Sequence, residues 1–182
     1  FQIFGTKNNK NKEILPYNFY GLSKLAAEKI LISWCKNNSV NLDILRYPRI
    51  IDQSNNSFIS KMISDAYFKF KIIINDERKK FRIVHLKDVI EANILSFKKI
   101  NTGIRTLNIS IEKEYNLLEI AKIIKSRLKS KIKIIVKKKV HKTNFEPNNV
   151  YLDKSFFNMS KEFKPKINIK EIIDKKIFEL KK

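Results

Sequence analysis

Two side chains of this 182-residue sequence, Tyr20 and Lys24, have types and spacing that suit proton transfer. They stand in the segment FYGLSKLAAE, residues 19–28, where a helix is expected to begin. Four residues make about one helical turn, so both side chains project from the same face. A tyrosine has a pKa of about 10, and a neighbouring ammonium group lowers it by favouring the phenolate. The pair is therefore a candidate acid/base, although a packed tyrosine beside a solvated lysine has the same spacing.

The residues around the pair follow a known pattern. Tyr20, Gly21, Ser23, Lys24 and Glu28 stand in the order Tyr-Gly-x-Ser-Lys, followed by small residues and Glu. This segment resembles the active-site helix of the extended short-chain dehydrogenase/reductases, the NAD-dependent sugar-nucleotide epimerase, dehydratase and reductase family. The resemblance implies that Tyr20 is the catalytic acid/base, and that Lys24 holds the nicotinamide ribose and lowers the pKa of that tyrosine. It also implies NAD or NADP as cofactor and a nucleotide-activated sugar as substrate.

Residues 45–50, LRYPRI, resemble the family's strand end that approaches nicotinamide and substrate. Arg49 stands where the family often has an asparagine that contacts the substrate diphosphate. A guanidinium fork can bind a diphosphate, and it can equally form a surface salt bridge, so both roles stay open. Tyr47 and Pro48 are candidates for lining the nicotinamide pocket, with structural packing as the alternative role.

Residues 81–92, FRIVHLKDVIEA, resemble the family block Arg-Asp-Phe-Val-His-Val-x-Asp-Val-x-x-Ala. The family arginine, which reaches the substrate diphosphate, aligns with Phe81, while Arg82 stands one residue later. One residue along a strand is the opposite face, so Arg82 is a substrate ligand only if the register shifts. His85, a single histidine on an apolar strand, is expected to be a structural core residue.

The first residues narrow the chemistry. Phe1–Gly5 matches the end of the strand that precedes the active-site helix, and the family's Ser or Thr would stand before Phe1. The 4,6-dehydratases of the family carry Asp-Glu where this chain has Phe1 and Gln2, so epimerase or reductase chemistry is expected instead. The glycine-rich turn that binds pyrophosphate is absent from a sequence with three glycines. We therefore expect this chain alone to be inactive and to bind NAD weakly.

The apolar patterns alternate between helix and strand. Expected helices cover 22–36, 57–70, 88–99 and 116–128, and expected strands cover 42–47, 72–74, 106–110 and 131–136. Ser57, Asp88 and Asn116 are the expected helix N-caps. With the resemblance, this pattern predicts an α/β fold: the C-terminal part of a Rossmann-type domain with a small mixed α/β substrate-binding portion. Residues 1–52 would carry C-terminal elements of the Rossmann domain with the active-site helix, and residues 53–182 mainly the substrate-binding portion, interleaved with returning Rossmann elements.

Charge offers a second class of function. The 39 basic and 18 acidic residues give a net charge of +21, which concentrates polyanions around the protein. Only six of the basic residues are arginine, however, whereas sequence-specific readers of nucleic acid rely on arginine forks. We expect only non-specific, salt-sensitive nucleic-acid binding. The alternative to an enzyme is therefore a non-catalytic remnant or a basic polyanion-binding module.

The remaining composition excludes several other classes. Cys35 is the single cysteine, and His85 and His141 are far apart, so neither a disulfide framework nor a protein-built metal site is expected. No apolar run of membrane-spanning length and no basic-then-apolar leader occurs, which predicts a cytoplasmic protein without membrane association. The expected partners are a second copy of the chain or the missing N-terminal half.

Overall fold

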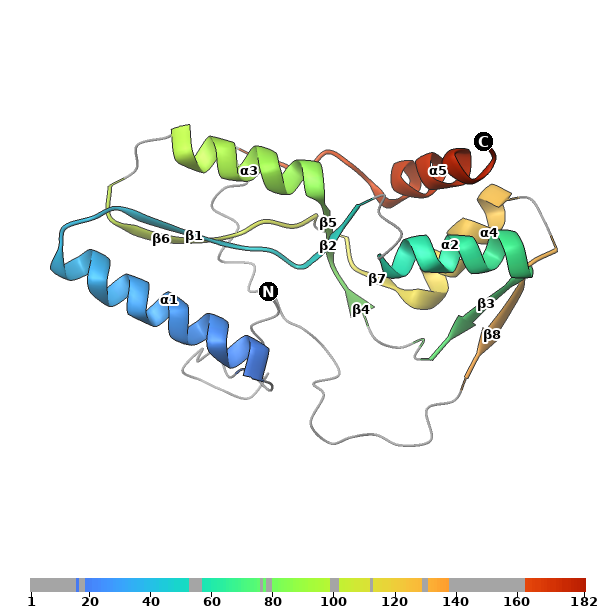
Figure 1. The fold of residues 1–182 in the computed structure, drawn as a ribbon, viewed down its shortest axis with the longest axis horizontal. Helices are drawn as coiled ribbons and strands as arrows, with labels where there is room; N and C mark the ends of the chain where they lie inside the picture. Colours follow the sequence, from blue (N-terminus) through green and yellow to red (C-terminus); the bar gives the residue numbers. More distant parts are fainter. Residues whose placement is uncertain are drawn as a thin grey trace.

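Helices and strands alternate along the chain in this computed structural model, and they form two groups (Figure 1). The structure describes residues 16, 19–52, 57–75, 77, 80–98, 102–111, 113–128, 131–137 and 163–182. The helices are α1 (Phe19–Asn37), α2 (Phe58–Lys69), α3 (Leu86–Lys98), α4 (Leu117–Leu128) and α5 (Ile169–Leu180). The strands are β1 (Leu42–Arg46), β2 (Arg49–Ile51), β3 (Lys71–Ile74), β4 (Lys80–Phe81), β5 (Ile83–His85), β6 (Ile104–Asn108), β7 (Tyr115–Asn116) and β8 (Lys133–Val136). The predicted α/β class is confirmed.

The first group has strands β1 and β6 between two helices. The strands are parallel, with Leu42 opposite Ile104 and Arg46 opposite Asn108. Helix α1 lies on one side of this pair and α3 on the other (Figure 1). Side chains alternate along β1, so Arg46 contacts Glu28 of α1, whereas Leu45 packs into the core beneath α3. This is the layered arrangement expected of a Rossmann-type sheet.

The second group has the parallel strands β3 and β8 with helices α2, α4 and α5 (Figure 1). Its core consists largely of isoleucine side chains, including Ile59, Ile63, Ile120 and Ile173. The predicted strand over 72–74 is present within β3. Burial alternates along β3, because its helices cover one face only and leave Ile73 exposed. Between the groups lie the short pairs β2–β5, parallel, and β4–β7, antiparallel.

Two predicted helix caps are confirmed. The backbone N–H of Ser60 donates to the hydroxyl oxygen of Ser57 at 3.1 Å, immediately before α2. At the start of α4, the N–H of Glu119 donates to Asn116 Oδ1 at 2.8 Å, and the N–H of Asn116 donates to Glu119 Oε2 at 2.9 Å. This reciprocal pair is a capping box.

The third predicted cap is wrong. Helix α3 begins at Leu86, which places Asp88 inside its first turn. The buried Asp88 carboxylate instead accepts the backbone N–H groups of Lys166 at 3.0 Å and Ile167 at 3.3 Å. Asp88 therefore ties the segment before α5 to the start of α3.

We expect the substitution Asp88→Asn to lower the free energy of unfolding by about 2 kcal/mol, because an amide offers one neutral acceptor where the carboxylate offers two charged ones. Urea unfolding followed by circular dichroism measures the change. The matched control is Asp65→Asn, which removes a half-buried carboxylate paired with the exposed Lys69 and should cost at most about 0.5 kcal/mol. Equal effects of the two substitutions would show that Asp88 does not clamp the segment.

His85 is also a structural residue, as predicted for a core position. Its ring is buried, and its Nδ1 accepts the backbone N–H of Lys87 at 3.0 Å. Burial lowers the pKa of His85 below 6.5, and Lys175 and Lys87 act in the same direction, whereas Asp88 and Asp52 oppose them. The neutral ring is therefore the form that the fold favours.

This shift predicts a pH dependence of stability. As the pH falls below 6.5, His85 takes up a proton in the unfolded state before it does so in the folded state. The contribution of His85 to the free energy of unfolding is therefore complete above pH 6.5 and decreases as the pH falls further. Urea unfolding at about pH 7.5 and about pH 5.5 brackets this interval. His85→Asn keeps an acceptor near Nδ1 without titrating, and its stability should change less between the two pH values. An unchanged dependence in that variant would exclude His85 as the cause.

Several sequence predictions fall on residues that the structure does not describe. These concern the strand end at Phe1–Gly5 and His141. Among the described helices, none has the length and apolar character needed to cross a membrane.

Candidate functional site

The start of α1 carries the predicted acid/base pair, Tyr20 and Lys24. Tyr20 and Lys24 lie in the first two turns, and the Lys24 Nζ lies 5.5 Å from the centroid of the Tyr20 ring. The Tyr20 side chain is 59% exposed, whereas Gly21 beside it is buried. The start of α1 and the carboxyl end of β1 lie at the same end of the first group, on the side of the second group (Figure 1). Ligands of open α/β sheets bind at this end of the strands.

A paired carboxylate and guanidinium hold α1 against the sheet. Arg46, the last residue of β1, donates from Nε to Glu28 Oε1 at 2.9 Å and from its terminal nitrogen to Glu28 Oε2. Both side chains are 13% exposed, so water competes weakly for this two-point contact. Glu28 lies one turn after Lys24 and two turns after Tyr20. The pair therefore sets how far along β1 the phenol and the amine lie.

Tyr47 and Pro48, the predicted nicotinamide contacts, are buried. Tyr47 belongs to the core beneath α3, and its hydroxyl oxygen accepts the side-chain N–H of Asn93 at 2.7 Å. Burial raises the pKa of Tyr47 to about 12, with the Asn93 hydrogen bond acting against that rise. Tyr47 is therefore neutral near pH 7 and unsuited to exchange protons there. Its nicotinamide role stays a prediction.

Arg49 lies over aromatic rings. Its guanidinium carbon is 5.3 Å from the centroid of the Phe58 ring and 5.2 Å from that of Phe81. The side chain is exposed, and no carboxylate among the described residues pairs with it. The surface salt bridge considered from the sequence is thus not found there. Its other role, at a substrate diphosphate, stays a prediction.

Arg82 occupies a different environment. Its side chain is 12% exposed, and its Nε lies 3.7 Å from Glu114 Oε1. The neighbouring Phe81 is buried in the core of the second group. The structure therefore places Arg49, rather than Arg82, as the more accessible guanidinium.

Comparison with known proteins assigns the chain to a family. Residues 2–111 match the model of the NAD dependent epimerase/dehydratase family. The chain belongs to this family. The resemblance predicted from the sequence is thereby confirmed. A search of curated proteins found no match.

Solved structures establish the fold of this family member. A UDP-glucuronic acid 4-epimerase from Bacillus cereus, in complex with UDP-glucuronic acid and NAD, matches with a TM-score of 0.77 and 18% identity over 98% of this chain and 59% of that one. A UDP-N-acetylglucosamine 4-epimerase from Methanobrevibacter ruminantium M1 matches with a TM-score of 0.77 and 22% identity over 98% and 60%. The UDP-glucose 4-epimerase from Thermotoga maritima gives 0.78 and 16% over 100% and 62%. The chain thus spans about three fifths of the chains it matches.

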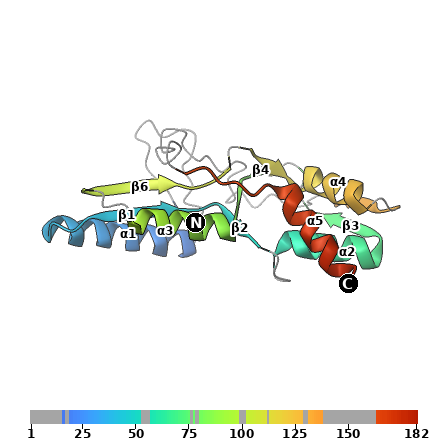
Figure 2. The same cartoon turned by 90° about the horizontal axis from the view of Figure 1, so that it is seen from above.

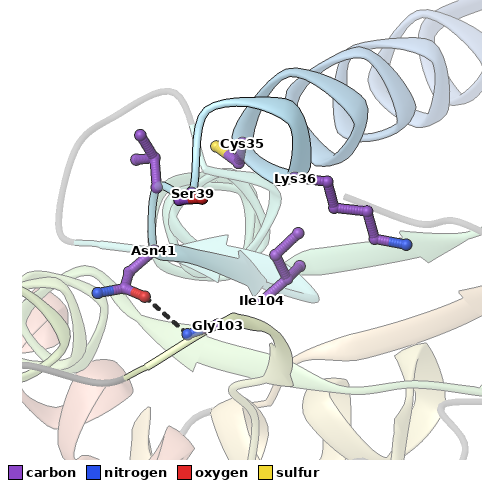
Figure 3. A pocket seen from close by; sticks show the side chains of 7 residues that line it. Cys35, Lys36, Ser39, Asn41, Gly103 and Ile104 are labelled. Carbon is purple, nitrogen blue, oxygen red and sulfur yellow. Dashed lines mark hydrogen bonds between the residues drawn. The ribbon is translucent and has the colours of Figure 1, made fainter.

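A hollow of about 430 Å³ lies at the opposite end of α1 from Tyr20. Figure 3 draws the residues that line it, which are Cys35, Lys36, Ser39, Val40, Asn41, Gly103 and Ile104. The backbone N–H of Gly103 donates to Asn41 Oδ1 at 2.7 Å, which joins two of the lining residues. A helix of 19 residues is about 28 Å long, so this hollow is remote from the Tyr20 pair. It also lies at the amino ends of β1 and β6, the wrong end for the ligands of such sheets.

The structure adds contacts around the candidate site that the sequence did not predict. Arg46 anchors α1, and Phe58 and Phe81 contact Arg49. Strand alternation could have placed Arg46 on the α1 face. Nothing in the sequence pairs Phe58 with Phe81. The described residues contain no cluster of His, Cys, Asp and Glu that could hold a metal ion.

Proposed function

We propose that this chain supplies the acid/base and substrate-binding part of an NAD(P)-dependent epimerase or reductase that acts on a nucleotide-activated sugar. The observation that carries the proposal is an exposed phenol, Tyr20, with the ammonium group of Lys24 beside its ring. The family match and the UDP-sugar epimerases of the same fold support it. Residues 1–52 would carry the Rossmann elements and residues 53–182 mainly the substrate contacts.

Tyr20 would move the proton in this reaction. Its exposed hydroxyl can reach a sugar hydroxyl at the open end of β1 and take up or return a proton there. The Lys24 charge electrostatically favours the phenolate that forms when the proton leaves. The cofactor, when bound, accepts or donates hydride at the sugar carbon. Whether the cycle ends in epimerisation or in reduction depends on residues around the sugar.

The described residues fit only one end of such a cofactor. Lys24 is half-buried at the start of α1, where its amine could contact the nicotinamide ribose. Pyrophosphate needs a glycine-rich turn before a helix, and the described glycines do not form one: Gly21 lies inside α1 and Gly103 precedes β6. The dinucleotide therefore requires further residues, which could lie on the same protein or on a partner.

The surface around β1 suits the docking of that part. Among the described residues, β1 has one neighbouring strand, β6, and α1 and α3 lie level with β1 rather than with β6 (Figure 2). Both helices expose apolar side chains. These are Leu22, Ile30 and Trp34 on α1 and Ile90, Ile94 and Phe97 on α3. A free strand edge between two apolar helices is a template for further strands of the sheet.

Complementation tests the proposed function. The chain, joined to or mixed with a dinucleotide-binding part of the family, is incubated with UDP-glucose, UDP-N-acetylglucosamine or UDP-glucuronic acid and NAD or NADPH. We expect NMR to show the sugar epimerised at a ring carbon or reduced. Association of the two parts without conversion of any of these nucleotide sugars would contradict an enzymatic role.

A second candidate function rests on charge. Lys71 and Lys133 stand opposite each other in the β3–β8 pair and are exposed, and the whole chain carries a net charge of +21. A polyanion-binding module should bind DNA without sequence preference, and its affinity should fall steeply with salt. An electrophoretic shift series across salt concentrations measures this. A sequence-specific complex that survives about 200 mM salt would indicate a dedicated nucleic-acid site.

A further inference from the structure

Arg49 is an exposed cation held in place by apolar groups. Its guanidinium lies within 5.3 Å of the Phe58 and Phe81 ring centroids, a distance at which ring faces attract a cation. An arginine that stacks on rings keeps the N–H groups at the edge of its plane free for hydrogen bonds. The rings thus orient Arg49, and no carboxylate among the described residues neutralises its charge.

The two rings are themselves fixed. Their centroids are 5.4 Å apart at an interplanar angle of 81°, an edge-to-face contact. Phe81 is 5% exposed and belongs to β4, where it stands opposite Tyr115 of β7. Phe58 is the first residue of α2, directly after the Ser57 cap. Elements from three parts of the chain therefore hold one guanidinium in one place.

We propose that Phe58 and Phe81 are positioning residues that hold Arg49 as the ligand for the diphosphate of a nucleotide sugar. The inference rests on the proposed function. The diphosphate role of Arg49 is the one predicted from the family resemblance, and the two rings that hold its guanidinium are what the structure adds. An oriented guanidinium matches two phosphate oxygens at once, which a flexible lysine does not. Less side-chain entropy is lost on binding when the guanidinium is already held.

Titration of the 182-residue chain with UDP, UMP and inorganic phosphate tests the inference, because Arg49 and both rings lie on this chain. Salt at about 0.15 M screens diffuse attraction by the many lysines. We expect UDP to bind more tightly than UMP or phosphate. Arg49→Gln should weaken UDP binding about tenfold or more. The matched control is Arg127→Gln, which removes one exposed guanidinium of α4 and the same charge, and should leave UDP binding unchanged.

A double-mutant cycle separates positioning from mere packing. Phe81→Leu keeps apolar bulk but removes the ring face, and should weaken UDP binding severalfold in the wild-type background. In the Arg49→Gln background the same substitution should have no further effect, because no guanidinium remains to be held. Phe58→Leu, at a half-buried helix start, gives an independent variant if Phe81→Leu lowers the melting temperature strongly.

The results of these titrations test the role of Arg49 separately from the proposed function. Equal affinity of the wild-type chain for UDP, UMP and phosphate, or no binding at all, would overturn the diphosphate assignment together with the proposed substrate class. Tighter UDP binding that Arg49→Gln leaves unchanged would overturn the inference alone. Losses from Phe81→Leu and Phe58→Leu that are the same in both backgrounds would show that the rings do not act through Arg49.

Discussion

Isothermal titration of the 182-residue chain with NAD, NADH or NADPH is expected to show no binding in the low-micromolar range. The described residues offer Lys24 as the proposed contact to the nicotinamide ribose, but they contain no glycine turn for the pyrophosphate. Such a turn supplies hydrogen bonds from backbone N–H groups at a helix start. One amine contact is worth far less than the roughly 8 kcal/mol that micromolar affinity requires.

The same titration after addition of a dinucleotide-binding part provides the positive control. Binding should then appear, and it should depend on association of the two parts at the β1 edge. Replacing Ile30 and Trp34 of α1, both exposed, with Lys would report whether that association uses the apolar face of the helix. Low-micromolar NAD affinity of the chain alone would refute the proposal that the dinucleotide requires further residues.

In the complemented protein, Tyr20→Phe is expected to lower kcat by about 10²–10⁴-fold, since general acid/base groups contribute rate factors of this size. The substitution removes one oxygen from an exposed side chain, so the melting temperature should not change. Tyr67→Phe is the matched control, because Tyr67 lies on α2, where its ring contacts Phe68. Loss of activity in both variants, or in neither, would remove the special role of Tyr20.

The sequence predicted correctly the features that depend on residues close to one another along the chain. The helix around Tyr20, the caps at Ser57 and Asn116, and strand β1 all depend on residues within a few positions of each other. The spacing of Tyr20 and Lys24 on one helix face belongs to the same class, and the structure brings the two side chains together. These features follow from backbone geometry and need no knowledge of the tertiary fold.

The wrong predictions concern partners that are distant in sequence. Asp88 resembles a helix cap because it is acidic and close to a helix start, but its partners Lys166 and Ile167 return from almost eighty residues later. Likewise, Arg49 could be assigned a diphosphate or a salt bridge, but not a pair of rings at positions 58 and 81. Such contacts depend on how elements pack, which residue spacing does not encode.

The most direct test of the acid/base assignment is a single-turnover measurement of hydride transfer. The complemented protein, with NAD or NADPH bound, is mixed rapidly with a nucleotide sugar, and the absorbance of the reduced nicotinamide is followed. An epimerase should show a rise with NAD, and a reductase a fall with NADPH. We expect this change to be fast for the wild type and for Tyr67→Phe, and slowed by at least about a hundredfold for Tyr20→Phe although the nucleotide sugar still binds. A Tyr20→Phe trace as fast as that of the wild type would contradict the acid/base assignment.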